Sequence, residues 1–321
     1  MRRRHLLATI GGLGVSASTA VWAAWPERPI TLVVPFAPGG IADLTARTVA
    51  QAMAGRLGTA IVVDNRPSAG SVVASTAVAK AAPDGYTLLL MSNANAVSTG
   101  LFKKLPFDVV KDFAPITTLG FFDLGVFVAD GSPLRTLADA VAHAKKNPGR
   151  LTIGTIAVGS SQHLAAELFK TRAGIDALTV PYKGTPAVLT ALRAGEIDVG
   201  FEILGPSLGQ LQAGVLRALA VTSDRRFPGL PDVPTVKESG LPAYVVSSWN
   251  ALAAPAKTPW PLIERLRRAA LEALAVPSVS AALQALGVRA QGSTPEQLQQ
   301  LLAGEVKRWS EVITQAGIER Q

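Results

Sequence analysis

The sequence has no cysteine and only three histidines. Without cysteine there is no disulfide, no thiolate metal ligand, no cysteine nucleophile and no lipidated cysteine anchor. One histidine, His5, belongs to the extreme N-terminal segment, so only His143 and His163 remain, too few for a histidine-rich metal site. We therefore expect a protein that uses no metal and no cofactor.

Charged residues are also sparse: they make up 17% of the 321 residues, whereas hydrophobic residues make up 48%. This balance is typical of a well-packed fold, and the length is sufficient for two lobes. The formal net charge of +8 includes three arginines at positions 2–4, and the remaining charges are scattered. No block of Lys and Arg alternates with aromatic residues, so we expect no nucleic-acid partner, although a mild basic excess suits an acidic ligand.

The first 24 residues have the layout of an export signal. The arginines at 2–4 precede an apolar stretch, 6–24, which lacks Asp and Glu and ends in small residues. The start also loosely fits a twin-arginine signal, so the export route stays open. A retained membrane anchor is the alternative, but serines and glycines interrupt the stretch. We expect residues 1–24 to be cleaved and the mature protein to lie in a bacterial periplasm.

The stretch Ile30–Asp43 (ITLVVPFAPGGIAD) is the part around which we expect the chain to be organised. Ile30–Val34 is an apolar, β-branched run typical of a buried strand, and prolines and glycines end it just before an amphipathic segment. The first turn of a helix has unsatisfied N–H groups, and glycines let an anion approach them closely. Gly39, Gly40 and Ile41 are therefore candidate anion donors. A plain strand-to-helix turn is the alternative.

Strands and helices alternate after this loop, which predicts a parallel α/β sheet. In the first half we expect strands at 30–34, 60–63 and 86–91 and helices at 41–57 and 71–81. Asn93 and Asn95 follow the third strand, at the edge where ligands bind in open α/β sheets. Two apolar runs within 116–128, split by Gly120 and Asp123, are predicted to be two strands that cross to a second lobe.

The alternation restarts in the second lobe. The elements expected there are helices at 137–146, 161–172, 186–194 and 207–213 and strands at 151–156, 178–181, 197–201, 216–221 and 244–252. From residue 259 the chain is mostly helical. The predicted fold class is α/β with two lobes, each a mainly parallel sheet flanked by helices, and a ligand cleft between them. We expect residues 25–123 and 249–321 to form domain 1 and residues 124–248 to form domain 2.

The second lobe repeats the helix-start pattern of the first loop. Gly159, Ser160 and Ser161 form a glycine turn with hydroxyls before a helix, so a ligand with two carboxylates could bridge the lobes and favour a closed form. An ordinary N-cap role for either serine is the alternative. Tyr182 follows the next predicted strand and Glu202 ends the one after it. Both are candidate ligand contacts, and Glu202 alternatively faces solvent.

Signals of catalysis are weak. Ser160 and His163 lie on adjacent turns at one helix start with no obvious orienting acid, and the nucleophile-elbow pattern G-x-S-x-G is absent. His163 is either a ligand contact or a structural residue. We expect a protein that is not an enzyme, and a serine hydrolase is the remote alternative.

Eight motifs together resemble one family along essentially the whole mature chain. They are VPFAPGGIAD (34–43), VVDNRPSAG (62–70), APDGYTLL (82–89), KKLPFDVVKDFAPIT (103–117), GSSQHLAAELF (159–169), VPYKGTPAV (180–188), LRALAVTSDRRFPGLPDVPTVKESGLP (216–242) and the pair Ser248-Trp249. The series is similar to that of the Bug family, the periplasmic substrate-binding receptors of tripartite tricarboxylate transporters. The resemblance is specific for the family and uninformative about the ligand.

The resemblance implies a two-lobed "Venus flytrap" binding protein that holds carboxylates through backbone amides and hydroxyls of one loop in each lobe. The residues that match the family's binding positions are Phe36, Gly39, Gly40, Ile41 and Asp43 in the first lobe and Gly159, Ser160, Ser161 and His163, with Tyr182 nearby, in the second. The chain departs from the family pattern at Ser68, Ser71, Asn95, Ser98 and Glu202-Ile203. We expect these departures to change recognition of the ligand's far end rather than of its anchoring carboxylate.

The expected function is a periplasmic receptor for a small carboxylate, either a di- or tricarboxylate, an aromatic acid or an acidic amino acid. The resemblance implies that it delivers this ligand to the permease subunits of a transporter. We expect a monomer. A sensor that signals through the same pocket to a two-component histidine kinase is the alternative.

Overall fold

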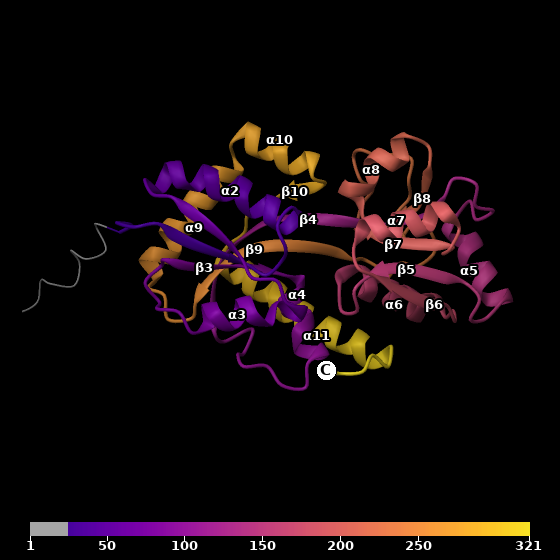
Figure 1. The fold of residues 1–321 in the computed structure, drawn as a ribbon, viewed down its shortest axis with the longest axis horizontal. Coiled ribbons are helices and arrows are strands. Elements are labelled where there is room, and N and C mark those ends of the chain that lie inside the picture. The colour runs from indigo at the N-terminus through magenta and orange to yellow at the C-terminus, as the bar shows by residue number, and fades with distance from the viewer. Residues whose placement is uncertain (1–24) are drawn as a thin grey trace, which may run out of the picture.

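A computed structural model describes residues 25–321, and the expected export signal at residues 1–24 lies outside the described residues. The strands are β1 (Ile30–Val34), β2 (Ile61–Asn65), β3 (Thr87–Ser92), β4 (Phe113–Ala129), β5 (Thr152–Ile156), β6 (Leu178–Tyr182), β7 (Val199–Ile203), β8 (Leu216–Val221), β9 (Ser247–Pro255) and β10 (Val288–Ala290). The helices are α2 (Ile41–Leu57), α3 (Val72–Ala79), α4 (Asn93–Leu101), α5 (Leu137–Lys146), α6 (Ser161–Ala173), α7 (Thr185–Ala194), α8 (Leu204–Gln212), α9 (Trp260–Leu274), α10 (Pro277–Ala285) and α11 (Pro295–Gln315). The strands follow the order β2-β1-β3-β9-β4-β7-β5-β6, and β10 and β8 each pair with β4. Two lobes result, connected by the long strands β4 and β9 (Figure 1).

The first lobe is built on β1, which pairs in parallel with β2 and β3, and β9 runs antiparallel to β3. Its central strands are buried on both faces, which explains their uninterrupted apolar runs. In β3, Leu88 and Leu90 belong to the cluster covered by α2 and α9, whereas Leu89 and Met91 belong to the cluster covered by α3, α4 and α11. The loop between β1 and α2 therefore leaves the sheet at the carboxyl end of a buried strand.

The expectation of two separate strands within 116–128 is wrong, because β4 runs without a break from one lobe into the other. Up to Asp123 it pairs with β9, and from Leu124 it pairs with β7. Gly120 does not interrupt the strand. A Cβ at Gly120 would come within 2.7 Å of Val288 Cγ1 in β10, so this glycine allows a close approach of two strands instead of ending one.

The second lobe repeats the parallel pattern, since β5 pairs in parallel with β6 and β7. The apolar sides of α5 and α6 share one buried cluster, and those of α7 and α8 share another. The chain then returns to the first lobe through β9, and α11 packs on α4 and β4 and also contacts α6. The predicted α/β class with two lobes is thus confirmed. No helix among residues 25–321 combines the length and hydropathy needed to cross a membrane.

The helix α4 was not expected, because Asn93 and Asn95 were predicted only to follow the third strand at the sheet edge. Asn93 is instead the first residue of α4, and Asn95 belongs to its N-terminal capping box. Ser92 Oγ accepts a hydrogen bond from the N–H of Ala94, and Asn95 Oδ1 accepts one from the N–H of Ser92. The helix expected at 71–81 is shorter, and α10 and β10 lie in a region where only helix was expected.

Candidate functional site

The loop between β1 and α2 carries the first set of candidate donors. Gly39 has a φ of +83°, which glycine adopts without strain. The N-cap residue of α2 is Gly40, and no side chain of the described residues caps the first turn of this helix. The N–H groups that begin at Ile41 can therefore bind an anion, and the helix dipole favours negative charge at this end.

The carboxylate of Asp43 is turned back onto the same loop. It accepts hydrogen bonds from the backbone N–H of Gly39 (2.9 Å) and from Nε of Arg47 (3.0 Å). Asn65 at the end of β2 donates to Asp43 Oδ1 (2.8 Å) and to the carbonyl of Phe36 (3.0 Å). Burial opposes ionisation of Asp43, but the hydrogen bonds from these neighbours outweigh it and hold its pKa below the ordinary value of 3.8. Asp43 is therefore charged at neutral pH and holds the loop in shape.

The second set of candidate donors lies at the start of α6. Ser160 Oγ accepts a hydrogen bond from the backbone N–H of His163 at 3.1 Å, so Ser160 is the N-cap of the helix. Nδ1 of His163 accepts a long hydrogen bond (3.5 Å) from the N–H of Gly159. The imidazole makes no hydrogen bond with the Ser160 hydroxyl. This pair therefore lacks the contact that activates a serine nucleophile.

His163 is buried in the second lobe, and desolvation lowers the pKa of its imidazole below 6.5. The carboxylate of Glu167 acts in the opposite direction and the ammonium of Lys170 in the same direction, but both effects are smaller. The ring is consequently neutral at pH 7. A neutral ring can border a site for an anion without adding a charge to it.

The start of α6 meets the first lobe through the hydroxyl of Ser161. Asn93 Nδ2 donates to Ser161 Oγ (3.0 Å), and the hydroxyls of Ser161 and Ser248 share a hydrogen bond of 3.1 Å. Asn93 is in turn held by Trp309 of α11, whose Nε1 donates to its Oδ1 (2.7 Å). At Gly159 a Cβ would come within 2.5 Å of Leu101 Cδ2 in α4. The second helix start is therefore packed directly against the first lobe.

Two hydrophobic residues of the first loop and one of the second lobe line the same region. Phe36 and Ile41 are partly buried at the margin of the cluster under α2, and Ile203, at the end of β7, packs against that cluster as well. The first loop and the end of β7 thus pack against the same hydrophobic cluster.

Glu202, next to Ile203, is completely buried, so the alternative of a solvent-facing carboxylate is wrong. Its Oε2 accepts hydrogen bonds from Thr185 Oγ1 (2.8 Å), Gln162 Nε2 (3.3 Å) and the N–H of Ile203 (3.2 Å). Its Oε1 has no hydrogen-bond partner among residues 25–321. Burial raises the pKa of Glu202 to about 7 despite these three hydrogen bonds.

Asn95 and Tyr182 have contacts within their own lobes. Asn95 is buried, and its Nδ2 donates to Ser75 Oγ (2.8 Å) while its Oδ1 serves the cap of α4. Tyr182 ends β6 and packs at the margin of the cluster that contains Val188 and Leu192. Asn95 consequently positions α4, whose first residue contacts the second lobe.

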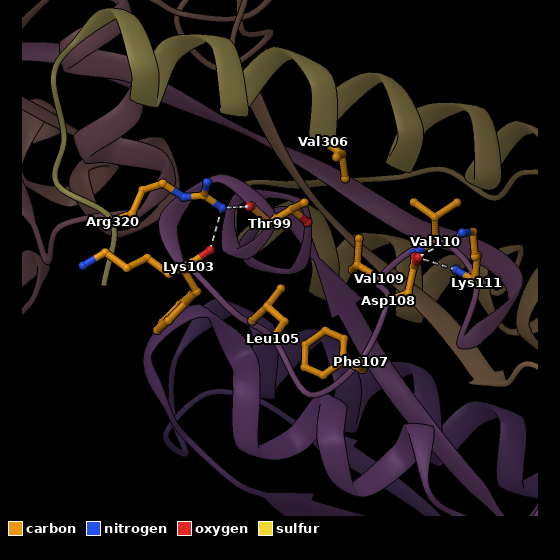
Figure 2. Close-up of a pocket in the computed structure, with 11 residues that line it drawn as sticks. Thr99, Lys103, Leu105, Phe107, Asp108, Val109, Val110, Lys111, Val306 and Arg320 are labelled. Carbon is orange, nitrogen blue, oxygen red and sulfur yellow. Dashed lines mark hydrogen bonds and ion pairs between the residues drawn. The ribbon is translucent and has the colours of Figure 1, made fainter.

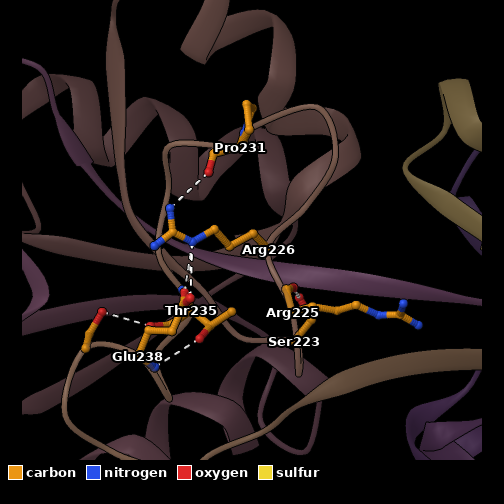
Figure 3. A network of polar contacts seen from close by, with 7 residues as sticks. Ser223, Arg225, Arg226, Pro231, Thr235 and Glu238 are labelled. Atoms are coloured by element: carbon orange, nitrogen blue, oxygen red, sulfur yellow. Dashed lines mark hydrogen bonds and ion pairs between the residues drawn. The ribbon is translucent and has the colours of Figure 1, made fainter.

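Two further features lie away from this region. A surface cavity of about 510 Å³ is lined by Thr99, by most residues of the segment from Phe102 to Lys111, and by Val306 and Arg320 (Figure 2). The loop between β8 and β9 is held by an ion pair in which Arg226 Nε lies 3.0 Å from Glu238 Oε2 (Figure 3). No group of three or more potential metal ligands occurs among residues 25–321.

Several residues of this region were not identified from the sequence. Ser248 was noted only as part of a motif, and the contacts of Trp309, Gln162 and Thr185 were not anticipated. One signal was present: Ser248 is one of three polar residues, with Ser247 and Asn250, in a strand that crosses between the lobes.

Comparisons with known proteins agree with this layout. The family model for the tripartite tricarboxylate transporter family receptor matches residues 45–318. The protein BugT of Bordetella pertussis (strain Tohama I) is 36% identical over 322 residues, which cover 99% of each chain. The solved structure of the periplasmic binding protein BugD is 32% identical with a TM-score of 0.80, and it covers 92% of this chain and 100% of its own.

Two further similar structures are those of proteins with carboxylates. Rpa4515 of R. palustris with adipate is 34% identical with a TM-score of 0.82, covering 92% of this chain and 100% of its own. MatC from Rhodopseudomonas palustris with bound malate is 33% identical with a TM-score of 0.78, covering 90% of this chain and 100% of its own.

Proposed function

The chain belongs to the tripartite tricarboxylate transporter receptors, a family of solute-binding proteins, and we propose that it captures a small carboxylate between its two lobes. The similar structures with adipate and malate support a carboxylate ligand. The ligand is proposed to be a di- or tricarboxylate, an aromatic acid or an acidic amino acid. The protein delivers it to membrane permease subunits and performs no chemistry on it.

The observation that carries this proposal is the contact between the two lobes at the start of α6. Ser161 of the second lobe accepts a hydrogen bond from Asn93 of the first lobe, and the uncapped start of α2 lies in the first lobe. A ligand that engages both helix starts favours the closed arrangement, because only that arrangement brings both sets of donors to it. Hinge closure of this kind is common in two-lobed binding proteins.

The proposed lobes are residues 25–123 with 249–321 and residues 124–248. The change in strand pairing of β4 between Asp123 and Leu124 supports this boundary. Export to the periplasm is part of the proposal, and the similarity to BugD, a periplasmic binding protein, supports it. A monomer suffices for this function, since both helix starts belong to one chain.

The proposed binding residues divide by role. Backbone groups at Gly40 and Ile41 and the start of α6 from Ser161 hold carboxylates, while Phe36, Tyr182 and Ile203 bound the space around the ligand. Gly39, Asp43, Gly159, Ser160 and His163 keep the two loops in shape through the contacts described above.

Isothermal titration of the purified protein with di- and tricarboxylates, aromatic acids and acidic amino acids tests the proposal. We expect saturable binding of at least one acid and an increase of its melting temperature, because a ligand that binds only the folded state stabilises it. No heat and no thermal shift with any of these acids would contradict the proposal.

A further inference from the structure

The side chain of Asn250 in β9 is completely buried, and neither Oδ1 nor Nδ2 has a hydrogen-bond partner among residues 25–321. The two other buried asparagines near the lobe interface, Asn93 and Asn95, have partners for both of their amide atoms. Among the described residues, Asn250 is alone in having two such unpaired side-chain atoms. Buried polar groups are nearly always hydrogen-bonded, so an amide left without partners in a core strand requires an explanation.

The register of β9 places Asn250 beside the candidate site. It lies opposite Ser92, the last residue of β3, and opposite Gly120 of β4. Ser92 marks the carboxyl edge of the parallel strands, the same edge from which the loop between β1 and α2 leaves the sheet. Asn250 is therefore at the level of this edge of the sheet.

Side-chain alternation gives the face on which Asn250 lies. Residues two apart on a strand share a face, so Asn250 shares one with Ser248 and Leu252. Leu252 belongs to the cluster under α2, and Ser248 bonds the start of α6 through Ser161. On this face of β9, the amide of Asn250 thus lies between Ser248, which contacts the start of α6, and Leu252, which belongs to the core beneath the start of α2.

We propose that Asn250 recognises a hydroxyl group of the bound carboxylate, so that the protein selects hydroxycarboxylates over the matching acids without a hydroxyl. This inference rests on the proposed function. A carboxamide has both hydrogen-bond donors and an acceptor. A hydroxyl group can pair with both kinds of atom, because it donates one hydrogen bond and accepts others. A carboxylate accepts hydrogen bonds but donates none, and a methylene group neither donates nor accepts them. Each therefore leaves at least one side-chain atom of Asn250 unpaired.

The buried carboxyl of Glu202 favours the same class of ligand. Its unpaired Oε1 comes from the second lobe, beside Ile203, which packs against the cluster that also contains Leu252. An uncharged hydroxyl of the ligand can hydrogen-bond this oxygen in either protonation state of the carboxyl, whereas a second carboxylate of the ligand can do so only while Glu202 is protonated.

Titration calorimetry with matched acids tests the inference: malate against succinate, and citrate against propane-1,2,3-tricarboxylate. We expect the hydroxylated member of at least one pair to bind more than ~10-fold more tightly, because a site built to bond a hydroxyl discriminates strongly against its absence. The variant Asn250→Leu, similar in size, should remove this preference while it leaves the affinity for the unsubstituted acid within about threefold. Thermal melting without ligand verifies that this variant folds, and replacing an unpaired amide with an apolar group should not lower its melting temperature.

Equal affinities within both pairs, or a preference that persists in Asn250→Leu, would overturn the inference and leave the proposed carboxylate function intact. A buried water that satisfies the amide would produce this second result. Absence of binding of all four acids and of the wider panel would instead overturn the proposed function, and the role of Asn250 with it.

Discussion

The carboxylate of Asp43 accepts a hydrogen bond from the backbone N–H of Gly39 at 2.9 Å. The two residues lie on either side of the helix start, so this bond closes the loop on itself. Asn65 fastens the closed loop to the end of β2 by donating to both Asp43 and Phe36. The backbone N–H of Gly39 is consequently already hydrogen-bonded within the loop, and the N–H donors at Gly40 and Ile41 are held in place for a ligand.

Replacement of Asp43 with Ala should weaken the binding of all carboxylates by ~10-fold or more, because the loop loses a buried charged acceptor with several hydrogen bonds. The order of preference among acids should stay the same, since Asp43 shapes the loop. Titration calorimetry with the preferred acids measures both quantities. Asp64→Ala, which removes a partly exposed ion pair with Arg66, is the control. A changed order of preference would show that Asp43 contacts the ligand directly.

Replacement of Gly40 with Val should reduce carboxylate affinity by ~10-fold or more, because a branched side chain crowds the donors of the helix start. The free energy of unfolding should fall by no more than about 1 kcal/mol, because the φ of −80° at Gly40 is ordinary and an added Cβ would meet only the carbonyl of Ala37 at 3.8 Å. Far-UV circular dichroism and urea titration measure folding. Gly131→Val, at an exposed turn with no atoms nearby, provides the comparison. Unchanged affinity would mean that the loop is only a turn.

The first loop could be predicted because its signals are local. Proline and glycine follow the β-branched strand Ile30–Val34, and α2 starts at the expected residue, Ile41. The start of α6 was predicted for the same reason. The break expected at Gly120 was wrong because the glycine accommodates β10, which lies far away in sequence. Local signals therefore located the helix starts but did not distinguish a chain break from close packing.

The roles of buried polar residues depend on contacts distant in sequence. Asn93 contacts Ser161 and Trp309, and its position after β3 predicted only that it lies at the sheet edge. The buried state of Glu202 follows from the packing of α6 and α7 around β7, and the unpaired amide of Asn250 follows from three adjacent strands. No local pattern contains this information.

Replacement of Ser161 with Ala should weaken ligand binding about fivefold, because the hydroxyl accepts a hydrogen bond from Asn93 across the lobes and one lost hydrogen bond corresponds to about 1 kcal/mol. Ser160→Ala is a matched control: it removes the cap of the same helix, at about 1 kcal/mol of stability, without an interlobe bond. Thermal melting and titration calorimetry should therefore separate the two variants. Equal effects of both substitutions on affinity would contradict a closing role for Ser161.

The contribution of Glu202 to the stability of the ligand-free protein should fall as pH rises toward neutrality. Burial raises the pKa of this carboxyl from 4.5 to about 7 in the folded state, so between these values the folded chain holds a proton that the unfolded chain has lost. The contribution of this group to the free energy of unfolding is highest below pH 4.5, decreases between pH 4.5 and 7, and is constant above pH 7. The total decrease is on the order of 3 kcal/mol. Glu202→Gln cannot ionise, and the difference in unfolding free energy between wild type and this variant, from urea titrations at pH 4.5 to 8, isolates the effect from all other titrating groups. A difference that does not vary with pH would show that Glu202 ionises as an ordinary exposed carboxyl does.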